Sequence, residues 1–213
     1  MNIQDGIIFF MEILGTIAFA ASGAMVGIRK RMDIFGICVL GVVTAVGGGM
    51  TRDVILGKLP SALEKPVYVV VSVITSLAIF ILLYIKHDLL SGRLGTFYDK
   101  AMLIMDSVGL GIFTSLGVMS GIDNGYPDNS FLLVFIGMLT GVGGGLMRDM
   151  MAGVPPYIFV KHIYACASIV GAIVCVYTYR WFGVVFSLIF GSAAVILMRY
   201  LAAHYRWNLP KLK

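Results

Sequence analysis

The chain has 213 residues, of which 59% are hydrophobic and only 13% are charged. Soluble domains carry roughly 25% charged residues, and so few charges could not cover the surface of a soluble globule. The net charge of +5 resides mostly in connections between apolar runs, where it indicates membrane topology and not nucleic-acid binding. The composition therefore predicts an all-α membrane protein with lipid around most of its surface and no nucleic-acid partner.

Apolar runs of about 20 residues, long enough to cross a bilayer as helices, recur along the whole chain. They predict seven transmembrane helices, at about residues 6–28, 34–56, 66–85, 101–120, 131–152, 163–179 and 181–198. Because the first run follows no basic segment and precedes no clear cleavage site, we expect a retained helix and not a signal peptide. Residues 1–213 would form a single transmembrane domain that ends in a cytoplasmic tail over 199–213.

A Gly-Gly-Gly-x-x-Arg-Asp motif occurs twice, and Arg148 of the second copy follows Arg52 of the first by 96 residues. Such an internal repeat indicates that one structural unit is used twice. We expect the first repeat over about residues 6–86, the second over about 101–180, and the last helix, at about 181–198, outside both. Further residues match at the same spacing: Thr44 with Thr140, Gly57 with Gly153, Pro60 with Pro156, and Tyr68 with Tyr164.

The distribution of Lys and Arg predicts the orientation in the membrane. The connections after the first, third and fifth spans and the tail are basic, whereas the loop at 121–129 is acidic and has no Lys or Arg. We therefore expect the N-terminus outside and the C-terminus in the cytoplasm. Because each repeat has three spans, its two copies would have opposite orientations, which is the inverted-repeat plan of many transport proteins.

The two glycine triplets, at 47–49 and 143–145, lie deep in apolar segments. Each glycine in a helix interior costs roughly 0.5–1 kcal/mol relative to alanine, so plain spanning does not explain them. They suit a bend at which the backbone lines a cavity, or a groove against which a neighbouring helix packs. Their recurrence with Arg-Asp favours a pathway, although a bend and close packing are compatible.

Arg52 and Arg148 predict a polar surface inside the membrane, because a buried arginine must pair, face water or reach the interface. Thr44, Gly48 and Arg52 share one helical face, and so do their counterparts in the second repeat. Snorkelling to the interface, with Asp as a local counter-ion, remains the alternative. The adjacent aspartates point about 100° away, so we expect them to pair across helices. The candidate pore-lining and kink residues are Thr44, Gly47, Gly48, Gly49, Thr51, Arg52, Asp53, Thr140, Gly143, Gly144, Gly145, Arg148 and Asp149.

Other titratable residues give weaker signals. Glu12 and Asp106 lie near the ends of predicted spans, where interfacial placement is expected. The three histidines, His87, His162 and His204, lack ligand spacing, so we expect no metal site. The three cysteines show no disulfide framework. No motif indicates an enzyme or a bound cofactor.

The two triplet segments, from Thr44 to Gly57 and from Thr140 to Gly153, resemble the signatures of the trimeric intracellular cation channel family, and the stretch from Gly15 to Lys30 also fits. The resemblance covers nearly the whole chain. It implies a homotrimer in a bacterial inner membrane, in which each protomer has its own pore for potassium, with sodium as another permeant ion. The glycine-kinked second and fifth helices would line that pore. Animal members carry an additional lysine signature on the fifth span that this chain lacks, so gating by that lysine is not expected here.

Three hypotheses follow. A potassium channel would need acids, carbonyls or threonine hydroxyls to offset its arginines. A secondary transporter of a small solute such as glycine could bind a carboxylate through Arg and is equally compatible with broken, repeated spans. A structural scaffold has no evident use for two buried arginines. For either transport function, we expect Gly48→Leu or Gly144→Leu to block flux while leaving assembly mostly intact.

Overall fold

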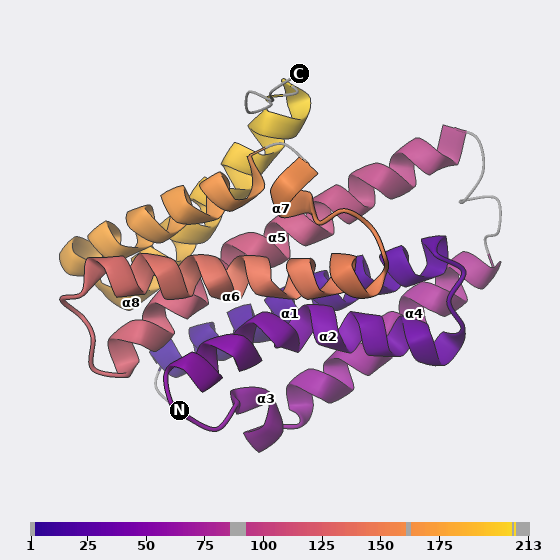
Figure 1. The fold of residues 1–213 in the computed structure, drawn as a ribbon. Coiled ribbons are helices and arrows are strands. Elements are labelled where there is room, and N and C mark those ends of the chain that lie inside the picture. Colours follow the sequence, from indigo (N-terminus) through magenta and orange to yellow (C-terminus); the bar gives the residue numbers. More distant parts are fainter. Residues whose placement is uncertain (1–2, 86–92, 161–162, 206, 208–213) are drawn as a thin grey trace.

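The computed structural model describes residues 3–85, 93–160, 163–205 and 207, and every regular element in these ranges is a helix (Figure 1). Six of the helices are long and apolar enough to cross a membrane. The expectation of an all-helical, multi-pass membrane protein is therefore confirmed. The helices are α1 (Ile3–Arg29), α2 (Ile34–Ile55), α3 (Ser61–Glu64), α4 (Val67–Ile85), α5 (Arg93–Asp123), α6 (Ser130–Met151), α7 (Tyr157–Val160) and α8 (Tyr164–His204), of which α3 and α7 are short.

The helices α2 and α6 begin and end in the same way, as their sequence repeat predicts. Asp33 accepts a hydrogen bond from the Gly36 N–H at 2.7 Å, and Asn129 accepts one from the Leu132 N–H at 3.0 Å. Such side chains satisfy amide groups that a helix start leaves without a partner. Beyond each helix end stands a glycine with positive φ, Gly57 or Gly153, in a conformation that glycine adopts at little cost.

Side-chain contacts define two ends of the bundle. At one, Arg29 at the end of α1 pairs with Asp99 in the first turns of α5 at 2.7 Å; we call this the Arg29 end. At the other, Lys58, which follows α2, donates a hydrogen bond to Ser120 near the end of α5 at 3.3 Å; we call this the Lys58 end. Thus α1 runs toward the Arg29 end, whereas α5 begins there and runs away from it.

The last long helix, α8, turns back on itself. Gly183 has φ 78° and ψ −171°, so the backbone leaves helical geometry there, and Figure 1 shows the ribbon reversing as its colour passes from orange to yellow. In a straight helix Gly171 and Gly191 would lie roughly 30 Å apart. Instead, a Cβ on Gly171 would lie 2.9 Å from the carbonyl oxygen of Gly191. The two parts of α8 therefore pack side by side.

Small residues let the helices approach closely, as is common in membranes. A Cβ on Gly23 of α1 would lie 2.7 Å from the Leu40 carbonyl oxygen of α2. In the second repeat, a Cβ on Gly117 of α5 would lie 2.9 Å from the Cα of Gly137 of α6. The same packing therefore joins α1 to α2 and α5 to α6.

Two sequence-based boundaries need correction. The break between the last two predicted spans lies at Gly183 and not next to Arg180, because the positive φ at Gly183 reverses the chain. Arg199, expected at the start of a polar tail, is 1% exposed and lies within α8, which continues to His204. Charge alone placed Arg199 in the tail, but the buried acid Asp106 lies 3.8 Å from it. The predicted positions of His87 and His162 lie outside the described residues.

Candidate functional site: two related ion clusters

The first of two ion clusters lies toward the Arg29 end and is fully buried; we call it the sealed cluster. The Arg148 guanidinium donates hydrogen bonds from Nη1 to Asp106 at 2.6 Å and to Ser22 at 2.5 Å, and from Nε to Asp149 at 2.8 Å. Arg148 and Asp106 are both 0% exposed. The cluster thus links α1, α5 and α6 through one guanidinium group.

Two further side chains complete the sealed cluster. The Tyr164 hydroxyl lies 3.4 Å from Asp106 Oδ1. Arg199 lies over the Tyr164 ring, 4.8 Å from its centroid, with Nη2 3.8 Å from Asp106 Oδ2. Two arginines therefore face two aspartates, which balances the charge inside the membrane, where an uncompensated ion is costly.

The second cluster lies toward the Lys58 end and is partly open; we call it the open cluster. Arg52 donates a hydrogen bond from Nε to Asp53 at 2.7 Å, and its side chain is 12% exposed. The other Asp53 oxygen accepts hydrogen bonds from the Ser61 N–H at 2.8 Å and the Ser61 hydroxyl at 2.9 Å. Glu12 accepts a hydrogen bond from the Tyr68 hydroxyl. Glu12 and Arg52 form no ion pair with each other.

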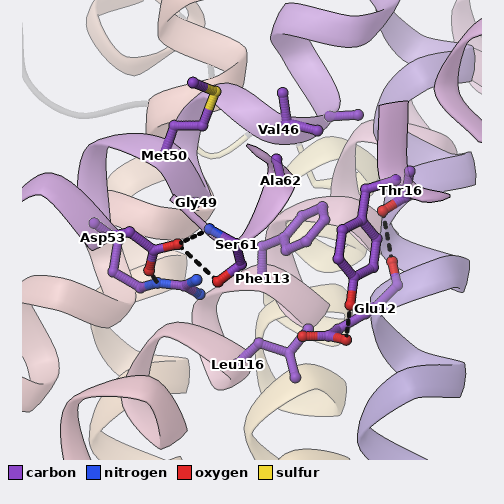
Figure 2. Close-up of a pocket in the computed structure, with 13 residues that line it drawn as sticks. Glu12, Thr16, Val46, Gly49, Met50, Asp53, Ser61, Ala62, Phe113 and Leu116 are labelled. Atoms are coloured by element: carbon purple, nitrogen blue, oxygen red, sulfur yellow. Dashed lines mark hydrogen bonds and ion pairs between the residues drawn. The ribbon is translucent and has the colours of Figure 1, made fainter. Parts of the chain in front are cut away.

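A pocket of about 50 Å³ separates the two halves of the open cluster. Figure 2 shows Glu12 and Asp53 on opposite sides of it, with Phe113 and Leu116 between them. A water molecule needs roughly 10–15 Å³ of such space, so the pocket holds only a few water-sized groups. Arg52 also lines it, and the two terminal nitrogens of Arg52 make no hydrogen bond to the described residues. The pocket is therefore small and bears charges of both signs.

A larger cavity of about 580 Å³ lies toward the Arg29 end, next to the sealed cluster. Asp149 and Tyr157 line it where it meets the cluster, and Arg29 and Lys30 line it at the Arg29 end. Each cluster therefore adjoins a cavity. Arg148, which is bound to the cavity-lining Asp149, is itself completely buried.

The two clusters are related by the internal repeat. Arg148, Asp149 and Tyr164 follow their counterparts Arg52, Asp53 and Tyr68 by 96 residues. The acids fit as well: Asp106 follows Glu12 by 94 residues, and each contacts the tyrosine of its own cluster. Even the loop contacts recur, because the Tyr157 N–H donates to Asp149 at 2.9 Å as the Ser61 N–H does to Asp53.

The predicted triplet residues meet where α2 crosses α6. A Cβ on Gly48 would overlap the Thr140 carbonyl oxygen, and one on Gly144 would overlap the Thr44 carbonyl oxygen. Both helices remain helical through their triplets. In this structure the middle glycine of each triplet therefore serves backbone-to-backbone packing, and the role of the triplets in lining a pore remains a prediction. A leucine at Gly48 or Gly144 would overlap the backbone of the other helix, which argues against the expectation that such variants leave assembly mostly intact.

The predicted threonines do not all face water. Thr44 and Thr140 are buried, and their hydroxyls donate to the Leu40 and Ile136 carbonyl oxygens within their own helices, each at 2.6 Å. Thr51 does the same to Gly47 at 2.9 Å and is partly exposed. The expected polar face is therefore present only in part. Arg52 and Thr51 are slightly exposed, whereas Arg148 is completely buried.

Two expectations about charged residues are wrong. Asp53 and Asp149 were expected to pair across helices, but each pairs with the preceding arginine, whose flexible side chain folds back to it. Asp106 was expected at the interface but is fully buried. Sequence reasoning also missed the tyrosine partners in both clusters, although the repeat had already matched Tyr68 with Tyr164.

Comparisons with known proteins place the chain among bacterial membrane proteins. A family model described as "Glycine transporter" matches residues 9–84 and 103–180. The starts of the two segments are 94 residues apart and their ends are 96 apart, the same spacings that relate the clusters. The UPF0126 inner membrane protein YadS of Escherichia coli (strain K12) is 36% identical over 208 residues, covering 96% of this chain and 95% of YadS.

Solved structures of trimeric intracellular cation (TRIC) channels have the same fold. A prokaryotic TRIC channel in 0.5 M KCl matches with a TM-score of 0.84 and 31% identity, over 95% of this chain and 98% of that one. The TRIC orthologue from Rhodobacter sphaeroides matches with a TM-score of 0.83 and 29% identity, over 94% and 98%. The similarity therefore extends over almost the entire chain.

Proposed function

The chain belongs to the UPF0126 membrane protein family and has the fold of the TRIC channels, and from that premise we propose that it is a channel for monovalent cations, mainly potassium. Each protomer of a homotrimer would hold its own pore. The pore would run from the pocket at Glu12 and Arg52, past the crossing of α2 and α6, to the cavity at Asp149.

Charge balance is the observation that carries this proposal. Arginines in a pore would repel cations if they stood alone. Arg52 is paired with Asp53, and Glu12 contributes a further carboxylate on the opposite wall of the pocket. Arg148 contacts two aspartates, Asp106 and Asp149, and Asp106 also faces Arg199. Neither cluster presents an excess of positive charge, so a cation can approach both.

We further propose seven membrane crossings arranged as two inverted repeats. The reversal of α8 at Gly183 supports a sixth and a seventh span within one assigned helix. The opposite directions of α1 and α5 support inversion, as do the clusters at opposite ends of the bundle. The Arg29 end carries Arg29, Lys30 and Lys100, so it would face the cytoplasm together with the C-terminus.

A secondary transporter of a small zwitterion such as glycine is the second candidate, favoured by the chemistry of the pocket. The terminal nitrogens of Arg52 could bind a carboxylate, which matches guanidinium geometry. Glu12 on the opposite wall could bind an ammonium group. The volume of about 50 Å³ would admit only a very small solute.

Potassium efflux and glycine uptake, measured on the same preparation of reconstituted vesicles, separate the two candidates. A channel gives potassium efflux that does not saturate at low millimolar concentrations and no concentrative glycine uptake. A carrier gives saturable glycine uptake without independent potassium efflux, and that result would replace the proposed function with the second candidate.

A further inference from the structure

We propose that Glu12 is a gating residue, which closes the Lys58 end of the pathway by pairing with Arg52, as Asp106 pairs with Arg148 at the Arg29 end. The two closures oppose each other: the structure has the sealed cluster closed and the open cluster open, and a conducting channel needs a further state in which both are open. This inference rests on the proposed function only in treating both clusters as ends of one pathway, and it holds for a channel or a carrier.

The equivalence of the two acids is the first step. Glu12 on α1 and Asp106 on α5 occupy matching positions of the repeat, and each contacts the matching tyrosine, Tyr68 or Tyr164. In both clusters the arginine Nε is bound to the adjacent aspartate, at 2.7 and 2.8 Å. The terminal nitrogens of both arginines therefore remain available to the acid on the first helix of the repeat.

The clusters differ in one contact. Asp106 accepts a hydrogen bond from Arg148 at 2.6 Å and stands 3.4 Å from its tyrosine hydroxyl. Glu12 instead accepts its hydrogen bond from Tyr68 and forms no ion pair with Arg52. This is the difference expected between a closed and an open state of the same device, with the acid moving from tyrosine to arginine on closing.

Closure at the Lys58 end would remove the pocket. Glu12 and Arg52 both line the pocket of about 50 Å³, so a direct pair between them occupies the space that now separates them. Glutamate is one methylene longer than aspartate, which gives Glu12 additional reach. An ion pair in the pocket excludes water and any solute from it.

Helix α1 connects the two closures, because it carries one residue of each cluster. Ser22 accepts a hydrogen bond from Arg148 at 2.5 Å, and Glu12 lies ten residues earlier on the same helix, roughly 15 Å away along its axis. A shift of α1 that brings Glu12 to Arg52 changes the position of Ser22 relative to Arg148. Closing one end therefore weakens the contacts that close the other.

Arg199 makes opening of the sealed cluster feasible. Removing one partner of a buried ion pair strands the other charge, which is strongly destabilising. Arg199 Nη2 lies 3.8 Å from Asp106 Oδ2, so Asp106 keeps a cation beside it when Arg148 moves away. Arg199 comes from the part of the chain beyond the repeat. Among the described residues, the second cation of the open cluster is Lys58, which lies 3.6 Å from Asp53 and not beside Glu12.

Thiol labelling tests the proposal without measuring flux. The reporter is Ala62→Cys, in the wall of the pocket, in a chain whose Cys38, Cys166 and Cys175 have been replaced. Reaction with a small charged methanethiosulfonate is followed in purified protein. Glu12→Gln cannot form the ion pair, so the pocket stays open and labelling is at least as fast as in the parent, whose pocket is open in this structure. Asp106→Asn weakens the sealed cluster, so labelling becomes several-fold slower, but only while Glu12 is present.

The double variant decides the result. If Glu12 closes the pocket, Glu12→Gln abolishes the slowing caused by Asp106→Asn. Slowing that persists in the double variant, or no slowing by Asp106→Asn while Glu12 is present, overturns the proposal. Ser22→Ala replaces Asp106→Asn if that variant does not fold, because it removes one hydrogen bond to Arg148. Glu64→Gln, at an exposed acid of α3, controls for the charge near the reporter. If this labelling pattern appears in protein that carries no potassium current, the result supports Glu12 as a gating residue and contradicts the proposed channel function.

Discussion

Arg148 of α6 and Asp106 of α5 form an ion pair of 2.6 Å in which both side chains are completely buried. The corresponding residues of the first repeat are Arg52 and Glu12. Both line a pocket, and they form no ion pair with each other. One sequence motif, used twice, thus occurs in two states within one molecule.

The different burial of the two arginines predicts different effects on stability. Arg148→Met leaves Asp106 and Asp149 buried with only Arg199 as a cation, so we expect a loss of about 3–5 kcal/mol in the free energy of unfolding. Arg52→Met is the matched control from the first repeat, and its loss should be clearly smaller because Arg52 is partly exposed and holds one carboxylate. Thermal unfolding of the purified variants in detergent measures both; equal losses would contradict the assignment of one sealed and one open cluster.

The crossing of α2 and α6 predicts opposite effects for two adjacent glycines. Gly48→Ala places a methyl group against the Thr140 backbone, so we expect a loss of about 1–3 kcal/mol from overpacking. A methyl group on Gly49 meets only the end of the Arg52 side chain, at 3.9 Å, so Gly49→Ala should be neutral or stabilising by up to about 1 kcal/mol. Denaturation midpoints of the two variants provide the comparison, and a tolerated Gly48→Ala would disprove the close approach.

The reversal of α8 predicts strict intolerance at one position. Gly183 combines φ 78° with ψ −171°, a region that is essentially restricted to glycine. Gly183→Ala and Gly183→Asn should therefore both destabilise the protein by about 1–3 kcal/mol. Asparagine gives no relief, because its preference for positive φ applies to the left-handed helical region. If the asparagine variant were as stable as the parent, the backbone conformation at Gly183 would be different from the one described.

The proposed trimer predicts a definite mass. Native mass spectrometry of protein released from detergent should show an assembly of three times the 23.1 kDa chain mass. A monomer or dimer under conditions in which the protein is folded and active would contradict the homotrimer, although each chain could still hold its own pathway.

Much of the fold could be predicted from the sequence because the internal repeat contains residues that are rare within membrane-spanning helices. The triplets and their Arg-Asp pairs identified two related units, and the resemblance to the TRIC channels drawn from them is confirmed by the solved structures. Hydropathy located the long helices. However, the predicted fourth span, at 101–120, is shorter than α5 at both ends, and the predicted break between the last two spans lies three residues before Gly183.

The acids of the clusters were missed for a physical reason. Six residues, 124–129, separate α5 from α6, whereas four, 30–33, separate α1 from α2. These two additional residues change the repeat spacing from 94 to 96, so a comparison held at 96 does not match Glu12 with Asp106. Burial of Asp106 was unpredictable from hydropathy, because its partners Arg148 and Arg199 come from distant parts of the chain.

The most direct test of the central claim, that this chain conducts cations across a membrane, is the reversal potential in a planar bilayer with a gradient of potassium chloride. The account predicts unitary currents that reverse close to the potassium equilibrium potential. Reversal at the chloride potential, or no current from folded protein that takes up glycine saturably, would contradict it.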